Sequence, residues 1–269
     1  MQNKTIPLFV SSDPALGAIN TTSGNDRFSV QFKRTIVIPE DAENITLELH
    51  SAEVWWSVLN ITILNNDFRL EVQGDQIYNV TIEPGLYDVS ALNSAVNNAL
   101  INQGLASGLI TLTGDNSTGK VLLSFTIAGL QVTWVPTGFF SLLGFTSGQL
   151  VPDPTFTVAA FSELSTNIAN FSDISSFIAH TSLVQGGIPL GDTLSQAIAN
   201  IQINVPPGSL INFSPNRVIT LNVNHLRGIS LNEASFWITD QLNRRLDFNG
   251  EFFSMLVIIR YHHDHLKVS

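Results

Sequence analysis

The chain of 269 residues contains no cysteine, which excludes disulfide bridges, cysteine-ligated zinc or iron–sulfur sites, and thiol catalysis. Charged residues are also scarce, because Asp, Glu, Lys and Arg together make up only 13% of the chain. No apolar run reaches the length of a transmembrane helix, so we expect no membrane insertion. What remains is long enough to bury the core of one large domain or of two smaller ones.

The few basic residues are spread along the chain, and the formal net charge is -10. Only Lys33-Arg34 and Arg244-Arg245 are adjacent basic pairs. A nucleic-acid surface needs clustered cations to displace the counterions of phosphates, so we predict no direct nucleic-acid binding. A polar but weakly charged surface suits packing against copies of the same chain, although composition alone favours an ordinary acidic soluble protein.

The most apolar segment comes close to the end of the chain. Residues 252–261 read FFSMLVIIRY and are rich in β-branched and aromatic residues. This pattern is typical of a strand that is buried on both faces or central in a sandwich. The preceding Asn249-Gly250 is a strong turn signal, because both residues accept positive φ at low cost.

The first 26 residues are small, polar and turn-prone, apart from one apolar patch. We interpret residues 1–26 as an N-terminal arm that becomes ordered only by docking. The patch is a candidate anchor for a neighbouring subunit, and its apolar members are Ile6, Leu8, Phe9 and Val10.

Strand patterns on both sides of a central block predict the fold class. Alternating or apolar segments occur before residue 60 and again after residue 151. These segments are residues 28–39, 44–59, 155–160, 176–184, 199–205 and 218–223, together with the two final strands. Their number matches the eight-stranded scale of a jelly roll. We therefore predict a mainly β protein, a single jelly-roll β-sandwich formed by residues 27–62 and 149–269.

The central block, residues 63–148, has a different pattern and predicts an inserted α+β subdomain. A short hairpin (68–72 and 78–82) precedes a helix over 88–103, and three strands follow it. Asp88 is the expected N-cap and Gly104 the expected stop. The apolar stripe of the helix is formed by Val89, Leu92, Val96, Ala99 and Leu100.

Residues 114–120 (GDNSTGK) match the first seven positions of a phosphate-binding loop. The eighth position is Val121, where magnesium binding requires Ser or Thr, and the segment joins two strands rather than a strand and a helix. We therefore predict a hairpin turn here.

The six histidines give a weak metal signal. His262, His263 and His265 with Asp264 form a local cluster, but they lack distant partners, and a metal role is not expected. His50, His180 and His225 are isolated within strand-like segments and are expected to be structural.

Acidic residues near the last turns are candidates for glycoside hydrolysis, which uses two carboxylates. They are Asp240, Asp247 and Glu251, close to Arg244 and Arg245. In tight turns such residues more often form local hydrogen bonds and ion pairs, and we favour that interpretation.

Exposed tryptophans offer a second binding hypothesis. Trp55 and Trp56 form a candidate glycan contact, a sugar-stacking platform, although at the end of an alternating strand one of them is expected to face the core. Trp134 and Trp237 are expected to face the core in the same way.

Two parts of the chain resemble a known protein family. Residues 85–100 (GLYDVSALNSAVNNAL), the following hairpin and residues 139–149 (FFSLLGFTSGQ) resemble a block of minor capsid or penton-like proteins. These proteins belong to virophages, Polinton-type elements and related double-stranded DNA viruses. Residues 235–261 resemble the closing strand–turn–strand pattern of the same family, and residues 205–215 (VPPGSLINFSP) lie in the matching order between them.

The resemblance implies a jelly-roll structural protein of the virion capsid, with no enzymatic activity and no cofactor. It further implies self-association, most simply as a pentamer at a five-fold vertex, and contacts with neighbouring capsid proteins. Two alternatives stay open: a carbohydrate- or receptor-binding β-sandwich of a virion spike or secreted protein, and a glycoside hydrolase.

Overall fold

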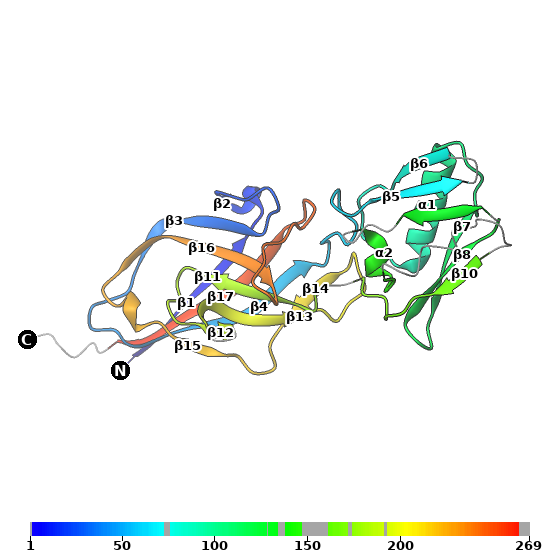
Figure 1. Cartoon of the computed structure of the whole chain (residues 1–269). Coiled ribbons are helices and arrows are strands. Elements are labelled where there is room, and N and C mark those ends of the chain that lie inside the picture. Colours follow the sequence, from blue (N-terminus) through cyan, green and yellow to red (C-terminus); the bar gives the residue numbers. More distant parts are fainter. Residues whose placement is uncertain are drawn as a thin grey trace, which may run out of the picture. The chain divides into compact units, whose positions relative to one another are not determined.

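The computed structural model describes residues 2–72, 76–127, 129–133, 138–146, 161–171, 174–190 and 193–263. The chain divides into two compact units (Figure 1). Unit 1 consists of Met1–Val58 and Ile174–Ser269, and unit 2 consists of Leu59–Asp173. Antiparallel sheets dominate both units, which confirms the mainly β class.

Unit 1 is a sandwich of two sheets. The first, sheet A, has the order β1-β17-β4-β14, with β15 also paired to β4. Its strands are β1 (Gln2–Ser11), β17 (Phe253–His263), β4 (Glu43–Trp55), β14 (Leu210–Phe213) and β15 (Thr220–Asn222). The predicted apolar strand over 252–261 is therefore β17, and it is central in sheet A.

The second sheet, sheet B, has the order β12-β13-β11-β16-β3-β2. Its strands are β12 (Ile188–Leu190), β13 (Thr193–Gln202), β11 (Ser176–Thr181), β16 (Ser230–Asp240), β3 (Arg27–Val37) and β2 (Ala18–Ile19). Two short 3-10 helices, η1 (Pro14–Leu16) and η2 (Asn224–Leu226), lie in the connections.

The strand order is that of a jelly roll. In chain order the principal strands are β1, β3, β4, β11, β13, β14, β16 and β17. Numbered one to eight in that order, they form the sequence 1-8-3-6 in sheet A and 5-4-7-2 in sheet B. This double Greek-key arrangement defines a jelly roll, so the predicted fold class is confirmed.

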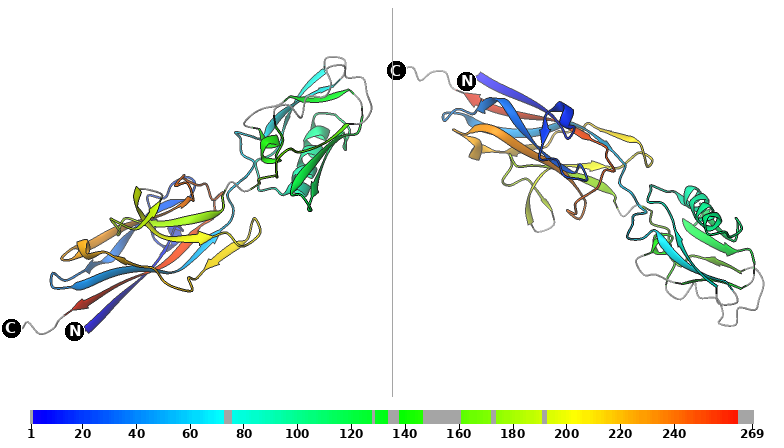
Figure 2. Two further views of the ribbon diagram at one scale, coloured as in Figure 1. Left: turned by 60° about the horizontal axis from the view of Figure 1, so that its bottom comes forward. Right: turned by 90° about the horizontal axis from the view of Figure 1, so that it is seen from above.

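The two ends of unit 1 differ in what they carry. At one end the first and last described residues lie side by side, since Gln2 pairs with His263 (Figures 1 and 2). At the other end Ser11 pairs with Ser254, and the neighbouring Phe253 pairs with Val54 near the end of β4. Unit 2 is inserted between β4 and β11, so the chain leaves for unit 2 from the end opposite the first and last described residues.

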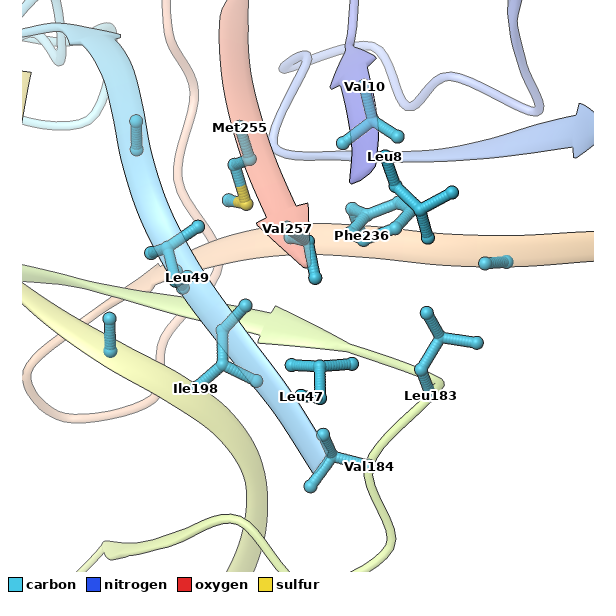
Figure 3. Packing of buried hydrophobic residues seen from close by; sticks show 14 of the residues in the cluster. Leu8, Val10, Leu47, Leu49, Leu183, Val184, Ile198, Phe236, Met255 and Val257 are labelled. Atoms are coloured by element: carbon cyan, nitrogen blue, oxygen red, sulfur yellow. The ribbon is translucent and has the colours of Figure 1, made fainter. Parts of the chain in front are cut away.

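The core of unit 1 lies between the sheets and follows strand alternation. Along β17 every second side chain, from Phe253 to Tyr261, is buried, and the intervening ones face outward. Side chains from both sheets meet in this layer (Figure 3). The labelled residues include Leu8 and Val10 of β1, Leu47 of β4, Ile198 of β13, Phe236 of β16 and Val257 of β17.

Unit 2 has its own core. Its described residues form two three-stranded sheets, β10-β8-β7 and β6-β5-β9, and two helices. The strands are β5 (Asp67–Val72), β6 (Gln76–Thr81), β7 (Ile110–Asp115), β8 (Lys120–Phe125), β9 (Leu130–Thr133) and β10 (Phe161–Leu164). The helices are α1 (Val89–Asn102) and α2 (Phe139–Leu142). The predicted hairpin is the β5–β6 pair.

Helix α1 has the predicted ends and buried face. The Asp88 side chain accepts a hydrogen bond from the Ala91 backbone N–H at 2.7 Å, which makes it the N-cap. Gly104 follows the helix with a φ of 77°, a left-handed conformation that glycine adopts without strain. The buried side chains are Leu92, Val96, Ala99 and Leu100. Asn93 on the polar side accepts from the Leu112 N–H and fastens the helix to β7.

The structure places the borders of the inserted unit outside those predicted. Unit 2 spans residues 59–173, whereas the sequence pattern indicated 63–148. The later border follows from backbone bonds: Ser165 N–H donates to Val121, Ala169 N–H to Gly119, and Asn170 N–H to Leu142. The predicted strand over 155–160 lies outside the described residues.

Candidate functional site

Strand β1 contains the predicted assembly residues, and the structure changes their interpretation. Residues 2–11 pair with β17 along their whole length, so they are part of sheet A rather than an arm. The prediction failed because the partner strand, β17, lies at the other end of the chain, so no local turn or hairpin pattern indicates the pairing. Leu8 and Val10 are buried in the core of unit 1, and Ile6 packs against it.

Phe9 is the exception among these residues. It alternates with Leu8 and Val10 and therefore faces outward, with 65% of its surface exposed. Of the four predicted assembly residues, Phe9 alone combines a large apolar side chain with high exposure.

Trp55 and Trp56 do not form a common platform. Trp55 lies at the end of β4 with 36% of its surface exposed, whereas Trp56 packs against the core of unit 1. The backbone of Trp56 is bonded in both directions, to Ser209 and to Gly208. The expectation that one of the two tryptophans faces the core is confirmed.

Phe252 is a second exposed aromatic side chain at the same end of sheet A as Trp55, and no sequence pattern indicated it. In the ladder between β4 and β17, the buried Val54 pairs with the buried Phe253. Trp55 follows Val54 at the end of β4, and Phe252 immediately precedes Phe253 at the start of β17, so continued alternation directs both to the opposite, outward side. Phe252 is 40% exposed. Only the register between β4 and β17 brings these two residues to the same end of sheet A, because most of the chain separates them in the sequence.

The carboxylates of Asp240 and Asp247, near the last turns, accept hydrogen bonds from neighbouring residues of the chain. Asp240 is buried, and its side chain accepts hydrogen bonds from the N–H groups of Leu242 and Arg244 and from the Arg244 guanidinium. Asp247 accepts a bond from the Asn249 N–H, which favours the turn at Asn249-Gly250. The favoured interpretation, local hydrogen bonds and ion pairs, is confirmed for these two residues.

A buried carboxylate that sequence reasoning missed is Asp26. Arg245 donates to both of its oxygens, and Thr22 donates a third bond. Burial would raise the pKa of Asp26, but the bonds from Arg245 and Thr22 and the charge of Arg245 outweigh it and hold the pKa below 3.8. The pair stabilises the packing of two loops at the end of unit 1 from which the chain leaves for unit 2.

Trp237 lies on the outer face of sheet B, not in the core as predicted. Its neighbours Phe236 and Ile238 are buried in the core, so alternation directs Trp237 outward. Its ring stacks on the His180 ring with 5.2 Å between centroids, and the Arg27 guanidinium lies 4.8 Å from it. The position of Trp134 lies outside the described residues.

His180 is a structural histidine, as predicted. Its Nε2 lies 2.9 Å from the Thr239 hydroxyl, and the residue is almost completely buried. Burial lowers the pKa of His180 to about 4, so it is neutral at physiological pH.

The segment that partly matches a phosphate-binding loop is a hairpin turn. Residues 114–120 form the turn of the β7–β8 hairpin, as predicted. There Asp115 accepts bonds from Ser117 and Thr118, which lower its pKa to about 2.

His262 and His263 end strand β17, and His263 Nδ1 lies 3.0 Å from Asp41 Oδ1. Asp264 and His265 lie outside the described residues. Within the described ranges, His, Asp and Glu side chains nowhere gather in a group of three that could hold a metal ion. No helix in those ranges is long and apolar enough to cross a membrane.

These observations define the class of the protein as a jelly-roll β-sandwich with a folded α+β unit inserted between its third and fourth strands. No protein-family model matches the chain, and no curated protein matches it. Among solved structures, the crystal structure of the selenomethionine-labelled mavirus penton protein matches 97% of this chain and 100% of that one. The sequence identity is 11% and the TM-score is 0.47, a likeness that by itself assigns no role.

Proposed function

We propose that the protein is a structural subunit of a virion, a minor capsid or penton component that assembles through the flanks of its sandwich. The observation that carries the proposal is the jelly-roll strand order with a folded unit inserted between β4 and β11. This architecture is the one implied by the resemblance of the sequence to penton-like proteins. The proposed role requires neither catalysis nor a cofactor.

The motifs that carry the resemblance occupy defined places in the fold. Residues 85–100 contain α1 and the segment that leads into it, and α2 opens the block that begins at residue 139. Residues 235–261 contain the end of β16, the loop held by Asp26 and Arg245, and most of β17. The family pattern thus coincides with the helices of unit 2 and with two principal strands of unit 1.

The two ends of unit 1 are different, which supports the proposal that it is a subunit of a capsid shell. Its first and last described residues and its connections to unit 2 lie at opposite ends of the strands. The outer faces of the two sheets are the flanks that we propose for lateral contacts. Repeated lateral contacts around an axis generate a closed ring from a single interface.

The experiment is to purify particles produced from the genome that encodes the chain and to quantify this protein in them by mass spectrometry. The expected result is a fixed ratio to the main shell protein that persists through repeated banding of intact particles. Absence of the chain from intact particles would contradict the proposal.

The exposed pair Trp55 and Phe252 favours a second candidate, a carbohydrate- or receptor-binding sandwich. Aromatic side chains on an open sheet face bind the apolar faces of sugars, and Glu53 on the same strand is exposed. Titration with a glycan library, observed by NMR, tests it. Saturable binding that Trp55→Ala abolishes and Trp237→Phe retains would support this candidate.

A further inference from the structure

The outer face of sheet A carries a compact group of apolar side chains. Pro7 pairs with Ile258 and Phe9 pairs with Leu256 across β1 and β17. All four face away from the core, because the residues that alternate with them are buried or packed against it. Pro7 and Phe9 are exposed, and Leu256 and Ile258 are half-buried. We call these four residues the apolar strip.

The free edge of β1 is closed to strand addition by Pro7. The Ser12 N–H donates to the Phe253 carbonyl, so even-numbered residues of β1 direct their backbone groups toward β17. Odd-numbered residues therefore direct theirs toward the free edge, and Pro7 has no N–H to offer there. Natural sheets use proline in this way to prevent edge-to-edge pairing. A partner of sheet A must then contact side chains on its face.

The charged side chains around the apolar strip are few, and among them Arg260 and Glu48 form an ion pair. Arg260 Nε lies 3.2 Å from Glu48 Oε2, and His50 Nε2 lies 2.9 Å from the same oxygen. Thr220 donates to the other oxygen of Glu48, and Ser254 donates to Glu53. The face is close to neutral in a chain whose net charge is -10. Two identical acidic chains repel each other least where such a face is part of the contact.

The size of the face fits a second folded domain. The long strands β1, β17 and β4 and the short strands β14 and β15 beside β4, about 4.8 Å apart and at about 3.3 Å per residue, outline roughly 600 Å² before side-chain relief is counted. A stable interface buries about 800 Å² on each partner. An open face of this size matches the flank of another sandwich better than it matches a peptide.

We propose that a second copy of this chain packs on the outer face of sheet A, with the apolar strip at the centre of the contact. This inference rests on the proposed function, because it names the surface through which the subunits assemble. Phe9 is the anchor, since it presents the largest exposed apolar side chain of the strip. Pro7 directs the contact to the face by closing the edge.

Sedimentation velocity over a wide concentration range tests the surface, with wild type, Phe9→Ser, Leu256→Gln and Leu242→Ser compared. Leu242 is the matched control, because it is 63% exposed in the loop between β16 and β17 and lies outside sheet A. Phe9→Ser should raise the dissociation constant of self-association about tenfold or more, and Leu256→Gln should raise it in the same direction. Leu242→Ser should leave it within about twofold of wild type. Thermal unfolding of each variant verifies the fold.

Equal dissociation constants for wild type, Phe9→Ser and Leu256→Gln would overturn the proposed surface and leave the proposed function standing. A wild-type chain that stays monomeric at every concentration but is present in particles would also overturn the surface alone. Absence from particles would instead overturn the proposed function. Pro7→Thr restores the missing donor and should produce larger, irreversible assemblies; an unchanged size distribution would remove the role given to Pro7.

Discussion

Asp26 and Arg245 lie 219 residues apart in the sequence and form a bidentate ion pair. The Arg245 Nε lies 3.0 Å from one carboxylate oxygen of Asp26, and the Arg245 Nη2 lies 2.9 Å from the other. The carboxylate side chain is 3% exposed, and the guanidinium is 69% exposed. The loops that contain them are also joined through backbone, since the Phe248 N–H donates to the Gly24 carbonyl. Gly24 has no space for a side chain, because a Cβ would lie 2.6 Å from the Leu246 carbonyl oxygen.

Arg245→Ala should lower the free energy of unfolding by about 2 kcal/mol, because it leaves a buried carboxylate without its cation. This loss of unfolding free energy is smaller than that expected for a fully buried ion pair, because Thr22 still donates to Asp26 and the Arg245 side chain is largely exposed. Arg217→Ala, at an exposed position, is the control and should change the value by less than about 0.5 kcal/mol. Urea unfolding measures both variants, and equal losses would contradict the role of the pair.

Stability should fall as the pH drops from about 6.5 to about 4, because of His180. Burial lowers the pKa of His180 to about 4 in the folded chain, so only the unfolded chain binds a proton in this window. The shift corresponds to about 3 kcal/mol of stability lost across the window. Asp26, whose pKa is lowered, adds a further loss that begins as the pH approaches the usual pKa of an aspartate and continues below it.

His180→Gln should flatten the dependence of unfolding free energy on pH between 6.5 and 4, whatever its effect on stability at neutral pH. His225→Gln is the matched control, since it removes a histidine that is not fully buried. Urea unfolding at a series of pH values makes the comparison. A slope that His180→Gln leaves unchanged would show that another group titrates.

Unit 1 should fold without unit 2. Asn60 Nδ2 donates to the Phe171 carbonyl at 3.3 Å, so the two ends of unit 2 lie close together and a short linker can replace residues 59–173. The shortened protein should retain one cooperative thermal transition and the near-ultraviolet circular dichroism of packed aromatic rings such as Phe28 and Phe236. A broad transition without that signal would show that unit 1 depends on unit 2.

The parts of the fold that local patterns determine could be predicted from the sequence. Asp88 and Gly104 mark the ends of α1, since capping depends only on neighbouring residues. Asn249 and Gly250 both have positive φ, as their turn signal required. The apolar run over 252–261 became the central strand β17 of sheet A, in which every second side chain is buried in the core.

The parts that depend on distant pairing could not be predicted. Strand β1 was misread because its partner, β17, lies at the other end of the chain. The pair Trp55 and Phe252, the ion pair of Asp26 and Arg245, and the apolar strip all depend on register between remote segments. Hydrophobic alternation indicates which face of a strand is buried, but it does not indicate which strand lies beside it.

The chain should not bind nucleic acid directly, because its net charge is -10 and its cations are dispersed. Fluorescence anisotropy with labelled duplex DNA at low salt should show no saturable change. Micromolar binding that weakens with added salt would contradict this expectation.

Self-assembly is the central claim, and native mass spectrometry of the purified chain tests it most directly. A discrete closed oligomer should form with rising concentration, and a pentamer of the 29.3 kDa chain would have a mass of about 147 kDa. Electron microscopy class averages of that species should show a ring. A chain that remains at 29.3 kDa at every concentration, and that binds a glycan through Trp55, would contradict the account and support the carbohydrate-binding alternative.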